Sequence, residues 1–146
     1  MLTVLNRQRK VPFDLEENRP RLEAVMIAAG AGRKEVTLLL ASDAAIRRLN
    51  REWRHISKPT DCLSFPSREG EGARYAGPFL GDVVISLETA ARQAAERGAT
   101  LDDEVLLLFV HSLLHLQGYD HQDARGERRM NAKTRALVQA VTGIAG

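Results

Sequence analysis

The chain of 146 residues has the length of one ordinary domain and is long enough to bury a sizeable hydrophobic core. Its content of 44% hydrophobic and 27% charged residues, with a net charge of +2, is typical of a globular protein, and no apolar run reaches the length of a membrane span. A single cysteine excludes an intrachain disulfide, and the first residues lack the apolar segment of a signal peptide. We therefore expect a cytoplasmic protein with one domain over residues 1–146 and no membrane contact.

Hydrophobic periodicity and turn residues divide the chain into strands and helices that mix within this one domain, as in α/β or α+β proteins. The expected elements are, in chain order, strand 2–6, helix 15–29, strand 35–40, helix 44–53, strand 61–65, strand 80–86, helix 87–97, helix 100–116 and helix 122–141. Pro20 is expected in the first turn of a helix that begins near Arg19. The segment 67–77 is rich in Gly, Glu and Arg, and we expect an exposed, mobile loop there.

The segment from Arg47 to Lys58 is the most basic in the chain, and its only acidic residue is Glu52. Trp53 and His55 are interleaved with its basic residues. Basic side chains beside an aromatic ring suit the phosphates and an unstacked base of single-stranded RNA. The alternative is an exposed helix face on which Trp53 points inward, and we expect Trp53 to anchor the core.

Three of the four histidines fall within eleven residues, from His111 to His121, at the end of a helix that is apolar on every side and therefore buried. On this helix His111 and His115 stand at positions i and i+4, so their imidazoles project from one face. Gly118 is the residue type that ends a helix in a left-handed cap, after which the chain can turn back and bring His121 to the other two. Three imidazole nitrogens with an open fourth position are typical of a zinc site that binds water.

One position separates this pattern from a metallopeptidase. The spacing matches the long zincin pattern H-E-x-x-H-x-x-G-x-x-H everywhere except at Ser112, which stands where that pattern has its general-base glutamate. Near neutral pH a serine does not take a proton from a metal-bound water. Two alternatives leave the histidines without a catalytic metal. They are histidines held by hydrogen bonds alone, or a structural zinc site closed by a fourth ligand such as Cys62.

Three blocks of the sequence carry a resemblance to a known family. Residues 111–121, which read His-Ser-Leu-Leu-His-Leu-Gln-Gly-Tyr-Asp-His, resemble the signature of the YbeY family of bacterial metal-dependent endoribonucleases. The segments 53–66 and 80–86 are similar to two further stretches of that family. Because the blocks come in the same order and the chain has a matching length, the resemblance covers essentially the whole chain.

The resemblance implies an α+β domain in which a small mixed β-sheet packs with helices and a central buried helix carries the metal histidines. It implies a zinc-dependent, single-strand-specific endoribonuclease of ribosomal RNA processing, acting in 16S rRNA 3′ end maturation and ribosome quality control. The expected substrate is RNA of the small ribosomal subunit, and the expected cofactor is one Zn²⁺ per chain, held by His111, His115 and His121. Arg54 matches an arginine of the family pattern, and we expect its guanidinium to bind the scissile phosphate.

The general base of this reaction stays open at the level of sequence. The candidates are Asp120, Asp61 and Asp82, although Asp120 would alternatively orient a histidine and Asp61 would alternatively cap a turn. Two other functions compete with RNA cleavage. They are a metallopeptidase-like or other metal-dependent hydrolase, and a non-catalytic ribosome-assembly factor with a structural metal.

Overall fold

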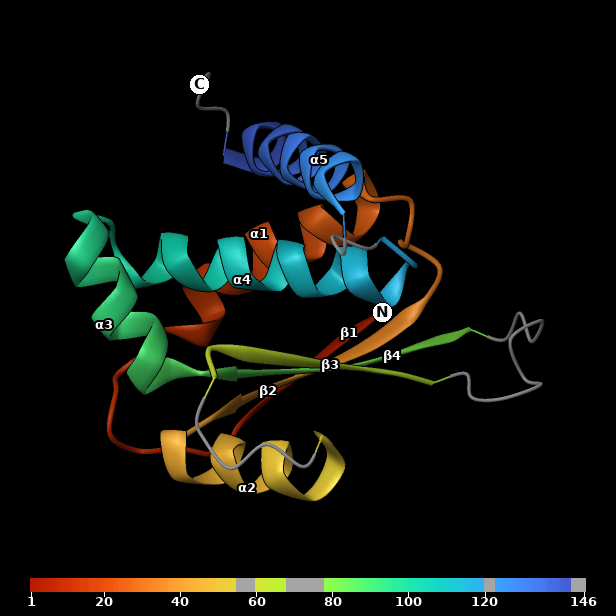
Figure 1. Ribbon diagram of the computed structural model, residues 1–146. Coiled ribbons are helices and arrows are strands. Elements are labelled where there is room, and N and C mark those ends of the chain that lie inside the picture. The colour runs from red at the N-terminus through yellow and green to blue at the C-terminus, as the bar shows by residue number, and fades with distance from the viewer. Residues whose placement is uncertain (55–59, 68–77, 120–122, 143–146) are drawn as a thin grey trace.

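The computed structural model describes residues 1–54, 60–67, 78–119 and 123–142, and Figure 1 shows how they fold into a layered α+β domain. The strands are β1 (Leu2–Asn6), β2 (Glu35–Ala41), β3 (Cys62–Pro66) and β4 (Phe79–Ser86). The helices are α1 (Leu15–Ala28), α2 (Asp43–Arg54), α3 (Leu87–Arg97), α4 (Leu101–Leu116) and α5 (Ala124–Thr142). The order of these elements confirms the prediction from the sequence. The loop expected over 67–77 falls, apart from Ser67, outside the described residues.

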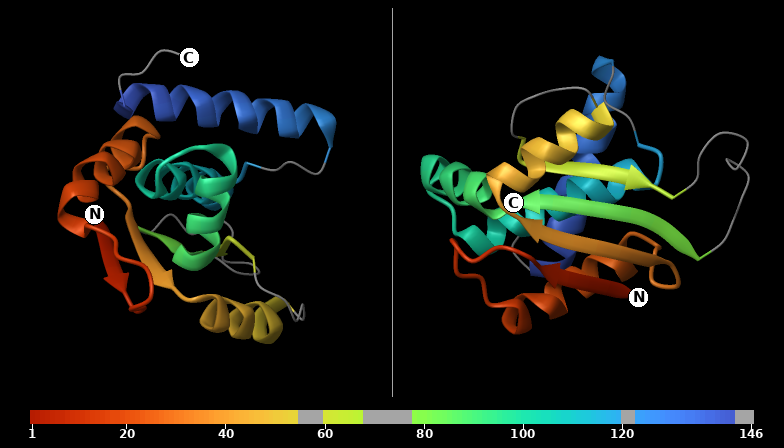
Figure 2. Two further views of the ribbon diagram at one scale, coloured as in Figure 1. Left: turned by 90° about the vertical axis from the view of Figure 1, so that its left-hand side faces the viewer. Right: turned by 90° about the horizontal axis from the view of Figure 1, so that it is seen from below.

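The four strands form one mixed sheet in the order β1-β2-β4-β3. The pairs β1–β2 and β2–β4 are parallel, whereas β3 runs antiparallel to β4 along one edge. Figure 2 shows this arrangement from below, with β1 at the opposite edge. The sheet therefore has two different faces for helices to cover.

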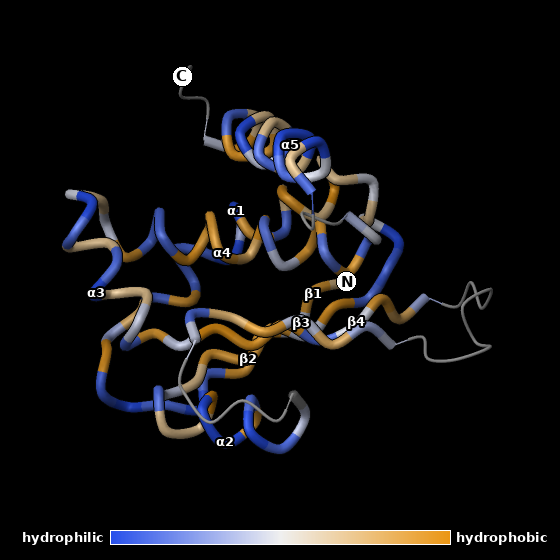
Figure 3. The backbone as a smooth tube through the Cα atoms, in the orientation of Figure 1, coloured by the Kyte–Doolittle hydropathy of each residue, from blue (hydrophilic) through white to orange (hydrophobic). Residues whose placement is uncertain are grey.

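Helices cover the two faces of the sheet unequally. In Figure 1, α1 and α4 lie against one face and α5 packs on top of them, whereas α2 alone lies on the other face. The strand side chains alternate accordingly, because successive residues of a strand point to opposite sides. Val83 and Ile85 belong to the large core beneath α4, and Val84 belongs to the smaller core beneath α2. Figure 3 shows hydrophobic residues concentrated on the strands and on α4, between the outer helices α5 and α2.

Helix α4 is the central helix of the domain, as its apolar sequence predicted. Phe109, Val110, Leu113 and Leu114 are completely buried within it. Its N-terminus is capped locally, because the Thr100 hydroxyl accepts a hydrogen bond from the Asp103 amide at 3.1 Å. A helix fixed by burial on nearly all sides gives a rigid support for any side chain on its remaining face.

Two expectations from the sequence are wrong. Helix α1 begins at Leu15 and not near Arg19, since the Asp14 carboxylate accepts from the Glu17 amide and caps the helix there, which leaves Pro20 inside it. Trp53 does not anchor the core, because 67% of its surface is exposed. No helix in the described ranges has the length and apolar character needed to cross a membrane.

Candidate metal centre

His111 and His115 lie side by side on the face of α4 that the core leaves partly exposed. Their ring centroids are 4.8 Å apart and their planes are inclined by 79°. Both residues are half-buried, whereas their neighbours Ser112 and Leu114 are fully buried. The i, i+4 spacing thus produces the paired imidazoles that the sequence predicted. Two neutral imidazoles so close together suit a transition metal such as zinc, so the residues present fit the expected cofactor.

The chain turns back immediately after these histidines. Gly118 has a φ of +100°, and its amide donates to the His115 carbonyl at 3.0 Å. The Tyr119 amide donates to the Leu114 carbonyl at 3.0 Å, which completes the left-handed helix cap expected at this glycine. The Gln117 side chain donates to the Ala29 carbonyl at 2.8 Å and ties the end of α4 to the end of α1. This cap directs the chain toward residues 120–122.

His121, the third predicted ligand, lies outside the described residues, as does Asp120. Within the described ranges, no group of three His, Cys, Asp or Glu side chains is placed to hold a metal ion. The three-histidine site therefore stays a prediction, of which the structure describes two members and the turn that precedes the third.

Two serines, Ser112 and Ser64, lie close to the histidines. Ser112 is fully buried, and its hydroxyl is the only fully buried side-chain oxygen or nitrogen in the described part of the chain that lacks a hydrogen-bond partner. It points into the core and so does not replace the base of a metallopeptidase. The hydroxyl of Ser64 on β3 donates to the Ser112 carbonyl at 3.3 Å, and this bond fastens the edge strand to α4 between the two histidines.

A cavity of about 470 Å³ opens beside His111, between α3, α4 and α5. Asp61, at the start of β3, also lines this cavity. Its carboxylate accepts a hydrogen bond from the Gln93 side chain at 3.3 Å. Of the two candidate bases that the structure describes, Asp61 is therefore the one in the same cavity as a predicted metal ligand.

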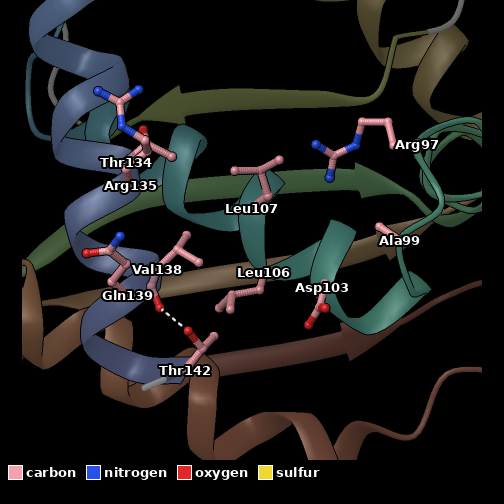
Figure 4. Close-up of a pocket in the computed structure, with 10 residues that line it drawn as sticks. All are labelled: Arg97, Ala99, Asp103, Leu106, Leu107, Thr134, Arg135, Val138, Gln139 and Thr142. Atoms are coloured by element: carbon pink, nitrogen blue, oxygen red, sulfur yellow. Dashed lines mark hydrogen bonds between the residues drawn. The ribbon is translucent and has the colours of Figure 1, made fainter. Parts of the chain in front are cut away.

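A second cavity, of about 360 Å³, lies further along α4 toward its N-terminus. Figure 4 shows that Leu106 and Leu107 of α4 face Val138 and Thr142 of α5 across it. Its lining contains no histidine, so it lies apart from the candidate metal centre. It shares Arg97, Leu107 and Thr134 with the cavity beside His111, so the two cavities adjoin.

Asp82, another candidate base, lies on the wrong face of the sheet. A side chain at Gly81 would meet Leu116 of α4, so position 81 faces α4 and its neighbour Asp82 faces α2. Asp82 also pairs with Phe65, which packs in the core beneath α2. The sheet therefore separates this carboxylate from His111. Sequence alternation alone did not reveal this, because it does not show which face α4 covers.

Burial raises the pKa of Asp82 above its ordinary value of 3.8. The folded chain then binds this proton more tightly than the unfolded chain, so the penalty of ionisation is absent at low pH and lowers stability as the pH rises past that value. Asp82→Asn is expected to increase the free energy of unfolding at pH 7 and to leave it nearly unchanged at pH 3. Urea unfolding at both pH values measures this, with Glu52→Gln on the exposed surface of α2 as the control. A lower stability of the Asp82→Asn variant at pH 7 would contradict it.

Arg54 is the last residue of α2, and its side chain is outside the described part of the structure. Its predicted role at the scissile phosphate is thus untested by the structure. The exposed Trp53 beside it is the feature that the sequence interpretation missed. Its position among basic residues was the available signal, and its exposure rules out the core anchor but leaves the RNA-binding interpretation of this residue a prediction.

Comparisons of this chain with a family model and with individual relatives all point to the same family. A model of the family described as Endoribonuclease YbeY matches residues 3–142. The protein of that name from Thermus thermophilus is 44% identical, over 94% of this chain and 100% of the relative. The one from Moorella thermoacetica is 46% identical, over 95% of this chain and 96% of the relative. The solution structure of TM1509 from Thermotoga maritima is similar in fold, with a TM-score of 0.68 and 28% identity over 98% of this chain and 90% of that one.

Proposed function

Because this chain belongs to the YbeY family of endoribonucleases, which hydrolyse phosphodiester bonds of RNA, we propose that it cleaves single-stranded RNA with the help of one zinc ion held by His111, His115 and His121. The observation that carries this proposal is the pair of imidazoles, 4.8 Å apart, on a helix whose other sides are buried. The cavity beside His111 gives a substrate access to the first histidine of this pair.

We further propose that the RNA is ribosomal and that the reaction serves 16S rRNA 3′ end maturation and ribosome quality control in the cytoplasm. The support is the resemblance of residues 53–66, 80–86 and 111–121 to the family, together with relatives of the same name over nearly their whole length. RNA of the small ribosomal subunit is then the partner that the enzyme meets.

Each residue of the proposed site has its own role in hydrolysis. When bound, zinc supplies positive charge for a phosphoryl oxygen and a lowered pKa for water. The buried helix α4 holds the rings of His111 and His115 in place. Asp61, oriented by the Gln93 amide, accepts the proton of the attacking water. Arg54 binds the scissile phosphate with the planar fork of its guanidinium and stabilises the charge that develops there.

The experiment that tests this function compares two substrates with the same purified protein. We expect cleavage of single-stranded ribosomal RNA, loss of that cleavage in chelator, and no cleavage of casein. The buried Ser112 supports the last expectation, because no carboxylate follows His111 on the helix. If the protein cleaves casein and leaves RNA intact, the metallopeptidase alternative is correct and the proposed function is wrong.

Arg54→Ala is expected to slow RNA cleavage by roughly 100-fold or more and to leave the bound metal unchanged, because the residue acts on the phosphate and not on the metal. Arg54→Lys should recover only part of the rate, since lysine lacks the bidentate fork. Metal analysis and single-turnover cleavage of a labelled RNA measure both effects. Loss of metal in Arg54→Ala would show a structural role instead.

A further inference from the structure

Helix α5 presents a basic face to solvent. It lies outermost in the domain, packed on α1 and α4 (Figure 1), so that one side of it is buried. The buried side carries Gly126, Met130, Thr134 and Leu137. With a turn of about 100° per residue, Arg125, Arg128 and Arg135 fall within about 80° of one another, on the opposite side of the helix. All three arginines are exposed, and they define the basic face of α5.

No carboxylate neutralises this face in the part of the chain that the structure describes. The three guanidinium groups form neither an ion pair nor a hydrogen bond there. Glu127 is the only acidic residue of α5, and the helix period directs it to the flank of the helix. Asp123, just before the helix, is engaged as its cap, since its carboxylate accepts from the Gly126 amide at 2.7 Å. The positive charges of the basic face are therefore available to an external anion.

The other side chains of α5 exclude several kinds of partner. The helix contains no aromatic residue, so it offers unpaired bases nothing to stack on. Its leucine, methionine and valines are buried or half-buried, whereas Ala132, Ala136 and Gln139 are exposed. Without an exposed large apolar side chain, the face lacks both the anchor of a protein interface and the apolar side of a membrane-surface helix. What it offers is positive charge, which suits a polyanion.

The rigidity of this array favours double-stranded over single-stranded RNA. With a rise of about 1.5 Å per residue, Arg125 and Arg135 stand roughly 15 Å apart along the helix axis. A double helix carries one phosphate charge per about 1.7 Å of its axis, about twice the density of one strand, and it is already rigid. A single strand would have to become ordered along α5, at a cost in entropy that no stacking would offset.

The basic face adjoins the candidate metal centre at one end. Arg129, one helical turn after Arg125, lines a small cavity together with Gln117, Gly118 and Tyr119. The last three residues belong to the cap at the end of α4. The basic face therefore borders the turn that leads to the predicted third metal ligand.

We propose that the basic face of α5 binds a double-stranded segment of RNA that adjoins the cleaved single strand, with Arg125, Arg128 and Arg135 on the phosphates of the duplex. This inference rests on the proposed function, which supplies RNA as the ligand, but the duplex is a part that the enzyme holds and does not cleave. Because the contacts are to phosphates, binding of the duplex is independent of its sequence. A substrate that combines a duplex with a single strand is then bound at two places, which raises its overall affinity.

Binding is tested with the full-length protein in the presence of a chelator, so that cleavage does not interfere. The protein is titrated with a labelled RNA duplex of about 16 base pairs at several salt concentrations, and fluorescence anisotropy gives the affinity. The triple variant Arg125→Gln, Arg128→Gln and Arg135→Gln should bind the duplex at least about tenfold more weakly. Its plot of log affinity against log salt should be shallower by about 2 to 3. Glutamine favours helix nearly as well as arginine, and circular dichroism checks that the variant is folded.

The matched control removes the same charge elsewhere. Arg7, Arg9 and Arg33 are exposed arginines outside α5, and within the described ranges their guanidinium groups likewise form no ion pair or hydrogen bond. Replacing these three by glutamine should leave the affinity for the duplex within about twofold of the parent. Equal losses in the two triple variants would show attraction by net charge alone and would overturn the inference.

Cleavage with zinc restored separates this inference from the proposed function. The parent should prefer a single strand that adjoins a duplex over a free single strand, and the α5 variant should reduce this ratio of kcat/KM values about tenfold. An unchanged ratio, or tighter binding of a single strand than of the duplex by the parent, would overturn the inference even if the protein cleaves RNA. Duplex binding that depends on the α5 arginines, in a protein that cleaves no RNA with zinc present, would support the basic face and contradict the proposed hydrolysis.

Discussion

Gly81→Ala is expected to lower the free energy of unfolding by about 3 kcal/mol, the sum of a strained backbone and an overpacked contact. Gly81 has a φ of +152°, a conformation that side chains rarely allow. An added Cβ would lie 2.5 Å from the Phe65 carbonyl oxygen and 2.8 Å from Leu116 of α4. The carbonyl belongs to the backbone of β3 and does not move without disturbing the β3–β4 pairing, so relief at this contact is costly. Thermal and urea unfolding measure the loss.

Gly98→Ala is the matched control for this prediction. Gly98 also has a positive φ, of +70°, but an added Cβ would meet nothing within 4 Å. Its replacement therefore adds backbone strain alone, and we expect a loss of roughly 1 kcal/mol. Equal losses in the two variants would show that the close approach of β4 to β3 and α4 contributes nothing at Gly81.

His115→Ala is expected to abolish metal binding and to reduce RNA cleavage by more than about 100-fold. Removing a residue that only supports a ligand already costs about 10–100-fold, and His115 is predicted to be a ligand itself. The helix should persist, because alanine favours helix and the side chain of His115 is only half-buried. In the presence of a chelator, the free energy of unfolding of the variant should lie within about 1 kcal/mol of that of the parent, as expected for a substitution outside the core.

His55→Ala serves as the matched histidine control, since His55 is the only histidine outside residues 111–121. It should retain its metal. If His115→Ala keeps its metal, the histidine pair on α4 is not a metal site. If it loses metal but cleaves RNA normally, the metal is structural, as in the assembly-factor alternative.

The helix that carries the candidate site was predictable from the sequence, because the signals that define this helix are local. Apolar residues on every side of α4 indicate burial, Thr100 caps its start, and Gly118 ends it with a positive φ of +100°. These features depend on residues within a few positions of one another. The pairing of His111 with His115 follows from the helix period alone and was equally predictable.

Two features depended on tertiary structure and were not predictable. Ile46 and Asn50 are almost fully buried on one stripe of α2, and Trp53 continues that stripe by spacing, yet it is exposed. Sequence period does not show that the last turn of a helix lies free of the core. The face of the sheet occupied by Asp82 was undetermined for the same reason, because strand alternation defines two faces but does not assign α4 to one of them.

The most direct test of the central claim is to count zinc in the purified protein and to measure RNA cleavage before chelation, after chelation and after zinc is restored. We predict about one zinc per chain, cleavage that disappears with the metal, and recovery when zinc returns. Cleavage that continues at full rate in the metal-free protein would contradict the histidine site as the centre of this enzyme.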